Sequence, residues 1–244
     1  MLFFIQFYVK GNNLINDREE NGLKGKVKLL IEKTFSATDK FGEIVKDDYV
    51  DRVYLIEYNE DGNMVKDSMT AWVNKYRYFE NGRLKETRMY DGDGPLTTVL
   101  TYEYLGDTVS IEKCYIEKNV YGGKRIRIFD KKGNLIKLID YDSKGIIKGS
   151  AIYKNDSNGN NIQFFTYDSK GGLKYKSDLM TFDEKGNRKY KTNEYKYDEK
   201  GNLIESIINN NVTKYEYDEN GNWIKCFENF NGDSKVIERE ILYY

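Results

Sequence analysis

The chain has 244 residues and nearly balanced charge, with 39 Lys and Arg against 40 Asp and Glu. A net charge of -1 provides no field to attract nucleic acid or an anionic membrane, so we expect no nucleic-acid partner. No stretch reaches the roughly 18 apolar residues of a membrane-spanning helix, so we expect no membrane span. The chain contains no histidine, which excludes Ser-His-Asp and Cys-His nucleophile activation and every histidine-ligated metal site.

The composition favours strands over helices. Tyr contributes 22 residues, Phe contributes 12, and there is a single proline. Aromatic side chains are enriched in strands, and tyrosine combines apolar area with a hydroxyl that can reach water. This composition suits a thin sheet better than a thick helical core.

The first 50 residues differ from the remainder of the chain. Residues 2–9 are apolar but lack a basic flank and a small-residue cleavage site, so they are either the remnant of a signal peptide or a first strand. The apolar run at 27–32 predicts a strand. Because repeat arrays need atypical ends, we expect residues 1–50 to form N-terminal strands that cap the sheet.

A repeated motif, Tyr-Asp-x-x-Gly-Asn-Leu, dominates residues 51–244. Its strongest copies are Tyr217–Trp223 and Tyr197–Leu203. Weaker copies are Tyr58–Met64, Tyr78–Leu84, Tyr90–Leu96, Phe129–Leu135, Tyr141–Ile147, Tyr167–Leu173 and Phe182–Arg188, and a copy with a longer turn begins at Tyr153. Copies recur mostly every 12 to 15 residues, which leaves one strand of about seven residues between turns.

The motif has a physical reason to form a hairpin. Asp favours the first position of a type I turn, and Gly supplies the left-handed conformation that follows, giving a three-residue hairpin with a bulge. Tyr217 should then lie opposite Trp223, and Tyr197 opposite Leu203. Strands joined by such short turns run antiparallel. The sequence therefore predicts an all-β fold: one extended antiparallel meander over 51–244, twisted or curled, in one continuous domain with residues 1–50.

The units at 195–203 and 215–223 resemble YD repeats of the RHS type, which occur in bacterial surface and secreted proteins. The ending from Trp223 to Tyr244 resembles the C-terminus of short YD-repeat proteins of Bacteroidota. The resemblance is strong over 125–244, weak over 51–124, and confined to 22–27 before that. A weaker similarity to MORN-like antitoxin repeats covers 78–96. The YD resemblance implies an exported binding module in the periplasm or at the cell surface; a cytoplasmic location stays open.

The usual catalytic and cofactor motifs are missing from the sequence. The glycines are separated turn glycines and form no phosphate-binding loop, so no cofactor is expected. The segments beginning at Asp218 and Asp156 imitate the start of a calcium-binding loop, but both lack its sixth-position glycine and closing glutamate, so no metal is expected. Cys114 and Cys226 cannot build a zinc site alone. They are either free thiols on strands or, in an exported protein, one disulfide.

The aromatic side chains are the remaining candidates for recognition. These side chains either stabilise the sheet by packing across strands or offer a flat surface on which a ligand can stack. They are Tyr195, Tyr197, Tyr215, Tyr217 and Trp223. We therefore expect a protein that is not an enzyme and that binds a glycan or protein partner through one sheet face. The alternatives are a structural or immunity-type protein that occludes a partner, and a small glycoside hydrolase with two carboxylates.

Overall fold

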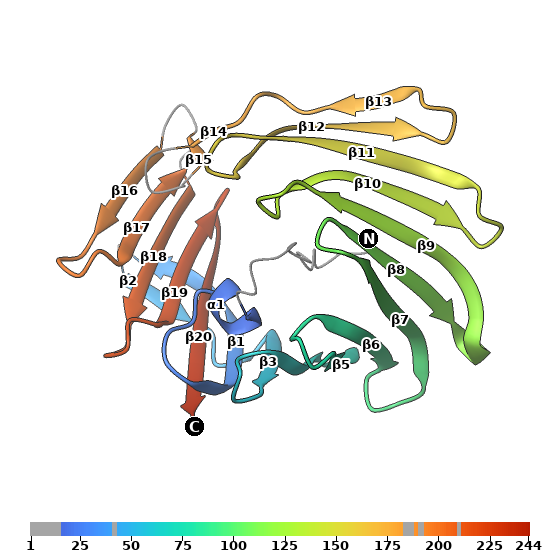
Figure 1. Ribbon diagram of the computed structural model, residues 1–244. Coiled ribbons are helices and arrows are strands. Elements are labelled where there is room, and N and C mark those ends of the chain that lie inside the picture. The colour runs from blue at the N-terminus through green and yellow to red at the C-terminus, as the bar shows by residue number, and fades with distance from the viewer. Residues whose placement is uncertain (1–15, 41–42, 183–187, 190–192, 209–210) are drawn as a thin grey trace. The chain divides into compact units, whose positions relative to one another are not determined.

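The computed structural model describes residues 16–40, 43–182, 188–189, 193–208 and 211–244. These residues form 20 strands, one four-residue helix and one 3-10 turn (Figure 1). The strands make an 18-stranded sheet and a separate two-stranded sheet. Hairpins follow one another along the chain, and β7 to β12 lie side by side in sequence order (Figure 1). The predicted all-β antiparallel meander is confirmed.

The elements have the following bounds. Helix α1 spans Asp17–Glu20 and the 3-10 turn spans Glu117–Asn119. The strands are β1 (Val27–Lys40), β2 (Glu43–Lys46), β3 (Arg52–Tyr58), β4 (Met64–Met69), β5 (Trp72–Tyr78), β6 (Leu84–Asp91), β7 (Leu96–Leu105), β8 (Val109–Ile116), β9 (Val120–Phe129), β10 (Leu135–Asp142), β11 (Ile147–Asn155), β12 (Asn161–Asp168), β13 (Leu173–Lys176), β14 (Thr181–Phe182), β15 (Arg188–Lys189), β16 (Asn193–Tyr197), β17 (Leu203–Ile208), β18 (Asn211–Tyr217), β19 (Trp223–Phe230) and β20 (Asp233–Tyr243).

The repeated motif forms the hairpin turn that its residues predict. Between β18 and β19, the Gly221 N–H donates to the Asp218 carbonyl at 3.1 Å, and the Asp218 N–H donates to the Asn222 carbonyl at 2.9 Å. Gly221 has a φ of 78°, in the left-handed region. Tyr217 lies opposite Trp223, with a register shift beside Tyr217. This is the predicted type I turn with a bulge.

Several other copies form the same pairing, but in the copy at 90–96 the left-handed glycine is Gly92, with a φ of 53°, and not Gly94. Tyr197 lies opposite Leu203, as expected. Equivalent pairs are Tyr58 with Met64, Phe129 with Leu135, Tyr141 with Ile147 and Tyr167 with Leu173. The copy at 182–188 includes residues outside the described part of the chain.

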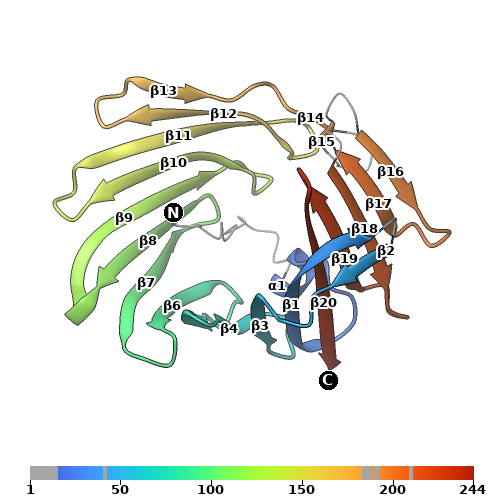
Figure 2. The same ribbon diagram turned by 180° about the vertical axis from the view of Figure 1, so that it is seen from behind.

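Strand β1 corrects the prediction that residues 1–50 cap one end of the sheet. It pairs with β20 on one side, where Leu30 faces Ile241, and with β3 on the other, where Leu30 faces Ile56 (Figure 2). Leu30 and Phe35 point to opposite faces of the strand and are 2% and 6% exposed. A strand that buries apolar side chains on both faces gains more from an internal position than from an edge.

The chain divides into two compact units. Among the described residues, the first unit contains 76–89 and 96–188, and the second contains 16–75, 90–95 and the segment from 189 to the C-terminus. Residue 50, where the predicted repeat array begins, falls inside the second unit.

Three further expectations concern the N-terminal residues, the cysteines and membrane-spanning helices. Residues 2–9 lie outside the described residues. Cys114 on β8 and Cys226 on β19 are free thiols. No helix in the described ranges has the length and apolar character needed to cross a bilayer.

Candidate functional site

The five aromatic residues predicted from the sequence lie in the second unit. Tyr195 and Tyr197 are on β16, Tyr215 and Tyr217 on β18, and Trp223 on β19. All five are half-buried, so they are neither fully enclosed nor free in solvent.

The structure brings three of these rings into one cluster. The Tyr215 ring centroid lies 6.0 Å from that of Trp223 and 6.4 Å from that of Tyr217. The Tyr217 hydroxyl donates to the Leu203 carbonyl on β17 at 2.7 Å. Aromatic pairs at these separations stabilise a sheet face and hold each ring in a defined orientation.

Arg239 on β20 extends the cluster and was not predicted. Its guanidinium carbon lies 3.2 Å from the centroid of the Trp223 ring. Its Nε donates to the Glu32 carboxylate on β1 at 3.0 Å, and Arg239 and Glu32 face each other across the two strands. Burial lowers the pKa of Arg239 from its ordinary value, although Glu32 opposes this effect. A planar guanidinium can stack on an indole and still pair with a carboxylate.

Tyr54 and Trp72 continue the cluster on the other side of Glu32. Tyr54 on β3 lies opposite Glu32, and its ring centroid is 6.0 Å from that of Trp72 on β5. The Tyr54 hydroxyl donates to Asp67 on β4 at 2.8 Å, where Asp67 is fully buried. Burial and the charge of Asp67 raise the pKa of Tyr54, so its hydroxyl keeps its proton and remains a donor.

Together these residues make a continuous strip across the sheet, which we call the aromatic–ionic row. It consists of Tyr215, Tyr217, Trp223, Arg239, Glu32, Tyr54 and Trp72.

The opposite face of the same strands has a different character. Lys33 on β1 pairs with Glu240 on β20, and Lys46 on β2 pairs with Glu238 on β20. All four side chains are a third or more exposed. Such solvated pairs contribute little to stability. They share that face with the buried Phe35, whose ring centroid lies 4.2 Å from the Lys46 ammonium.

Neutral-pH proton transfer is disfavoured at the β18–β19 end of the row. Cys226, opposite Tyr215, is 2% exposed, and burial raises the pKa of its thiol to about 12. Burial likewise raises the pKa of Tyr215 to about 12. Both groups therefore remain protonated at neutral pH, and neither is poised to act as a nucleophile or general base.

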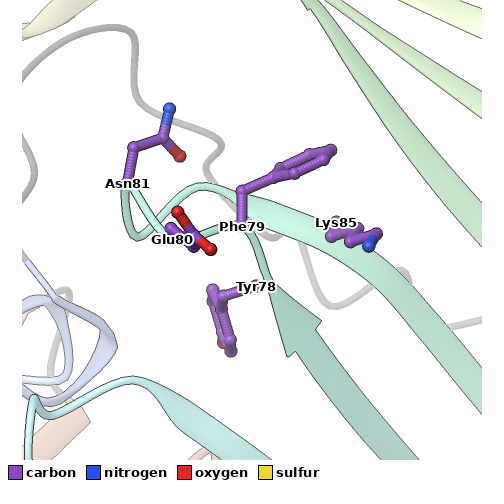
Figure 3. Close-up of a pocket in the computed structure, with 5 residues that line it drawn as sticks. All are labelled: Tyr78, Phe79, Glu80, Asn81 and Lys85. Atoms are coloured by element: carbon purple, nitrogen blue, oxygen red, sulfur yellow. The ribbon is translucent and has the colours of Figure 1, made fainter.

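A hollow of about 490 Å³ lies in the first unit at the β5–β6 turn (Figure 3). One hairpin supplies its lining: Tyr78, Phe79, Glu80, Asn81 and Lys85. The Lys85 ammonium lies 5.5 Å from the Phe79 ring centroid. The lining includes one carboxylate, Glu80, whereas glycoside hydrolysis uses two. The hollow therefore lends no support to the hydrolase alternative.

The sequence carried only a partial signal for the row. Tyr215, Tyr217 and Trp223 stand in motif copies, so their proximity follows from a local turn. Arg239, Glu32 and Tyr54 lie outside any copy and meet only because β1 pairs with both β20 and β3. Both β1 and β20 carry several other charged residues, so the sequence does not single out Glu32 or Arg239.

No protein-family model and no curated protein matches the chain. Among solved structures, it is similar over 72% of its length to TcdB2-TccC3-TEV, at 14% identity and a TM-score of 0.34, but it spans only 11% of that chain. A porin-like protein from Bacteroides uniformis matches 90% of this chain and 98% of its own, at 11% identity and a TM-score of 0.41. A DUF1329 family protein from Desulfovibrio piger covers 89% and 86% of the two chains, at 9% identity and a TM-score of 0.19. Likenesses this distant assign no function.

Proposed function

We propose that the protein is a non-catalytic binding module that recognises a glycan or protein partner through the aromatic–ionic row. The observation that supports this most directly is the stacked Arg239–Trp223 pair, with 3.2 Å between the guanidinium and the ring centroid. Stacking and the Glu32 ion pair together orient the guanidinium before any ligand arrives. A pre-oriented flat surface loses little conformational entropy on binding.

The row also combines the two kinds of contact that recognition requires. Trp223, Tyr215 and Trp72 are half-buried rings that offer apolar area. Arg239 and Tyr54 add polar groups whose positions are set by Glu32 and Asp67. Sugar rings stack on aromatic faces while their hydroxyls bond to neighbouring polar groups, and protein partners use the same residue types as anchors.

An exported location belongs to the same proposal. The motif copies at 197–203 and 217–223 resemble YD repeats of bacterial surface and secreted proteins, and that resemblance is the support for the periplasm or cell surface. Fractionation of the source cells, followed by protease treatment of intact cells, tests the location. Recovery of the protein only from the cytoplasm would contradict it.

The binding proposal is tested with a glycan array and a pull-down from the source organism. We expect Trp223→Ala to weaken retention of the bound glycan or protein by at least about ten-fold, as removal of a central anchor does. Arg239→Lys keeps the charge but loses the planar stack, so it should also weaken binding.

Tyr49→Ala is the matched control, because Tyr49 is 76% exposed and lies outside the row. It should leave binding unchanged. Circular dichroism establishes that each variant is folded. Folded Trp223→Ala and Arg239→Lys proteins that retain every wild-type ligand would refute the proposed binding face.

A further inference from the structure

Carboxylates and lysines are separated onto opposite faces of the sheet in strands β8 to β13. Residues two apart on a strand share a face, and so do directly opposed residues on neighbouring strands. By this register, every carboxylate of these strands lies on one face: Glu112, Asp140, Asp142 and Asp168. The opposite face, which we call the lysine face, carries Lys113, Lys124, Lys137, Lys154 and Lys176.

Two of these lysines stand directly opposite each other. Lys113 and Lys124 face one another across β8 and β9, and like charges in this arrangement destabilise a sheet. The Lys113 ammonium bonds to Glu103 on β7, whereas Lys124 forms no ion pair within the described ranges. The Lys124 ammonium lies instead 4.9 Å from the centroid of the Tyr141 ring. A ring orients an ammonium without neutralising it, so the charge of Lys124 remains uncompensated.

The same arrangement recurs toward β13. The ammonium groups of Lys154 and Lys176 lie 5.1 and 5.9 Å from the centroid of one ring, that of Phe165. Both lysines are exposed. Neither they nor Lys137 on β10 pair with a carboxylate among the residues that the structure describes. The lysine face therefore presents oriented positive charge that this part of the chain does not balance.

An apolar stripe runs between the lysines. Ile111, Ile126 and Ile139 lie directly opposite one another on β8, β9 and β10, and all three are half-buried. The opposed lysine pair lies about 7 Å from the stripe on one side, and Lys137 lies at the same spacing on the other, since each is two residues further along its strand. Accessible apolar area with a charged rim is characteristic of protein interaction surfaces.

The stripe discriminates among the anionic partners that lysines attract. Nucleic acids and acidic polysaccharides present charge without a continuous apolar side, so they would leave the isoleucines uncovered. A bilayer takes up apolar side chains that protrude, whereas these isoleucines are half-buried between longer lysines. An acidic amphipathic helix has both an apolar side and carboxylates beside it. Two turns of such a helix span the roughly 10 Å from β8 to β10.

We propose that the lysine face docks an acidic, amphipathic segment of a protein partner. The apolar side of that segment covers the isoleucine stripe, and its carboxylates pair with Lys124 and Lys137. The lysine face lies in the first unit and shares no residue with the aromatic–ionic row. The proposal therefore stands independently of the function proposed for that row.

The test is fluorescence anisotropy of three labelled synthetic peptides titrated with the full chain. One peptide carries Leu on one side of a helix and Glu on the other, the second is a scramble of it, and the third has Lys in place of Glu. We expect the first to bind, the scramble to bind about ten-fold more weakly, and the Lys peptide not to bind. Binding of the first should weaken as salt rises from about 0.05 to 0.5 M.

A double variant, Lys124→Gln with Lys137→Gln, should weaken binding of the acidic amphipathic peptide by about five-fold or more. The matched control is Lys131→Gln with Lys144→Gln, which removes the same charge from exposed turn lysines of the same unit. It should change binding by less than about two-fold. Because Lys124→Gln relieves the repulsion from Lys113, it should unfold at the same urea concentration as the wild type or at a higher one.

Three results would each overturn the proposal. The first is equal binding of the scrambled and the acidic amphipathic peptides. The second is wild-type affinity in the folded Lys124→Gln, Lys137→Gln variant. The third is tighter binding of phosphatidylglycerol vesicles, a single-stranded DNA oligonucleotide or polygalacturonate than of the acidic amphipathic peptide, which would assign the face to a lipid, nucleic-acid or polysaccharide partner instead.

Discussion

The turns at 130–134 and 218–222 share one sequence pattern but use its asparagine in different ways. At 130–134 the motif is closed locally: the Asn134 N–H donates to Asp130 Oδ1 and its side-chain amide donates to Oδ2, both at 2.9 Å. Burial alone would raise the pKa of Asp130, but these bonds, with the Lys132 N–H, lower it overall.

At 218–222 the same side chain reaches another part of the chain. The Asn222 amide donates to the Lys24 carbonyl at 2.9 Å and to the Tyr243 hydroxyl at 2.8 Å, and its oxygen accepts from the Lys24 N–H at 2.7 Å. The Tyr243 hydroxyl donates to Asp218 Oδ2 at 2.7 Å, the position that Asn134 occupies at Asp130. Asn222 is 2% exposed.

The turn between β3 and β4 is tied to the N-terminal segment as well. The Arg18 N–H donates to the Gly62 carbonyl at 2.9 Å, and the Met64 N–H donates to the Asp17 carboxylate at 2.7 Å. The Asn21 amide donates to the Tyr58 hydroxyl at 2.9 Å. The comparison teaches that backbone bonds and glycine are enough to make the turn, which leaves the asparagine side chain available for long-range contacts.

The largest effect should come from Asn222→Ala. It removes three side-chain hydrogen bonds at a buried position and leaves the Lys24 N–H and carbonyl without these partners. We expect a loss of about 2 to 4 kcal/mol in the free energy of unfolding, measured by urea denaturation. Asn134→Ala, which removes one local side-chain bond, should cost about 1 kcal/mol. Equal losses in the two variants would contradict the difference between the turns.

Gly62→Ala and Gly201→Ala separate backbone strain from long-range contact. Their φ angles are 86° and 84°, so the cost of a left-handed alanine is the same in both, about 1 kcal/mol. A Cβ at Gly201 meets nothing within 4 Å, whereas one at Gly62 lies 2.7 Å from Asn16 Cγ, the residue that caps α1. Gly62→Ala should therefore be the more destabilised variant, with faster hydrogen exchange at the α1 amides. Identical free energies of unfolding for the two variants would show that the contact with this turn does not stabilise α1.

The smallest effect is electrostatic and concerns Asp156. The side-chain hydrogen bond from Asn160 is the largest cause of its lowered pKa, and the Asn160 and Asn158 N–H groups add to it. A carboxylate whose folded pKa is depressed stabilises the protein above its unfolded pKa of about 3.9, and this contribution is lost as the pH falls through the folded value. Asn160→Ala should raise the pKa of Asp156 and weaken the acid dependence of the melting temperature. Carbon-13 titration of the carboxyl group measures the shift, and an ordinary Asp156 pKa in the wild type would contradict it.

The sequence was sufficient to predict the local geometry of the turns. It was insufficient to predict the position of β1 in the sheet and the full set of residues in the aromatic–ionic row. Turn position, the positive φ of Gly201 and Gly221, and the Tyr197–Leu203 and Tyr217–Trp223 pairs were all predicted. The internal position of β1 was not predicted, and neither was the contribution of Arg239 to the aromatic–ionic row. The five predicted aromatic residues share one unit, but their role in binding stays a prediction.

The reason lies in the distance along the chain over which each feature is specified. Each copy of the turn motif is held by hydrogen bonds between residues at most four positions apart, such as the bond from Asn134 to Asp130. The motif alone therefore determines the turn. The pairing of Leu30 with Ile241 and Ile56 joins segments that no repeat relates. Strands with similar turns and similar apolar patterns can pair in several orders, and only burial of β1 on both faces selects one. That choice brings Glu32 to Arg239 and Tyr54, and thereby builds a row that the motif does not encode.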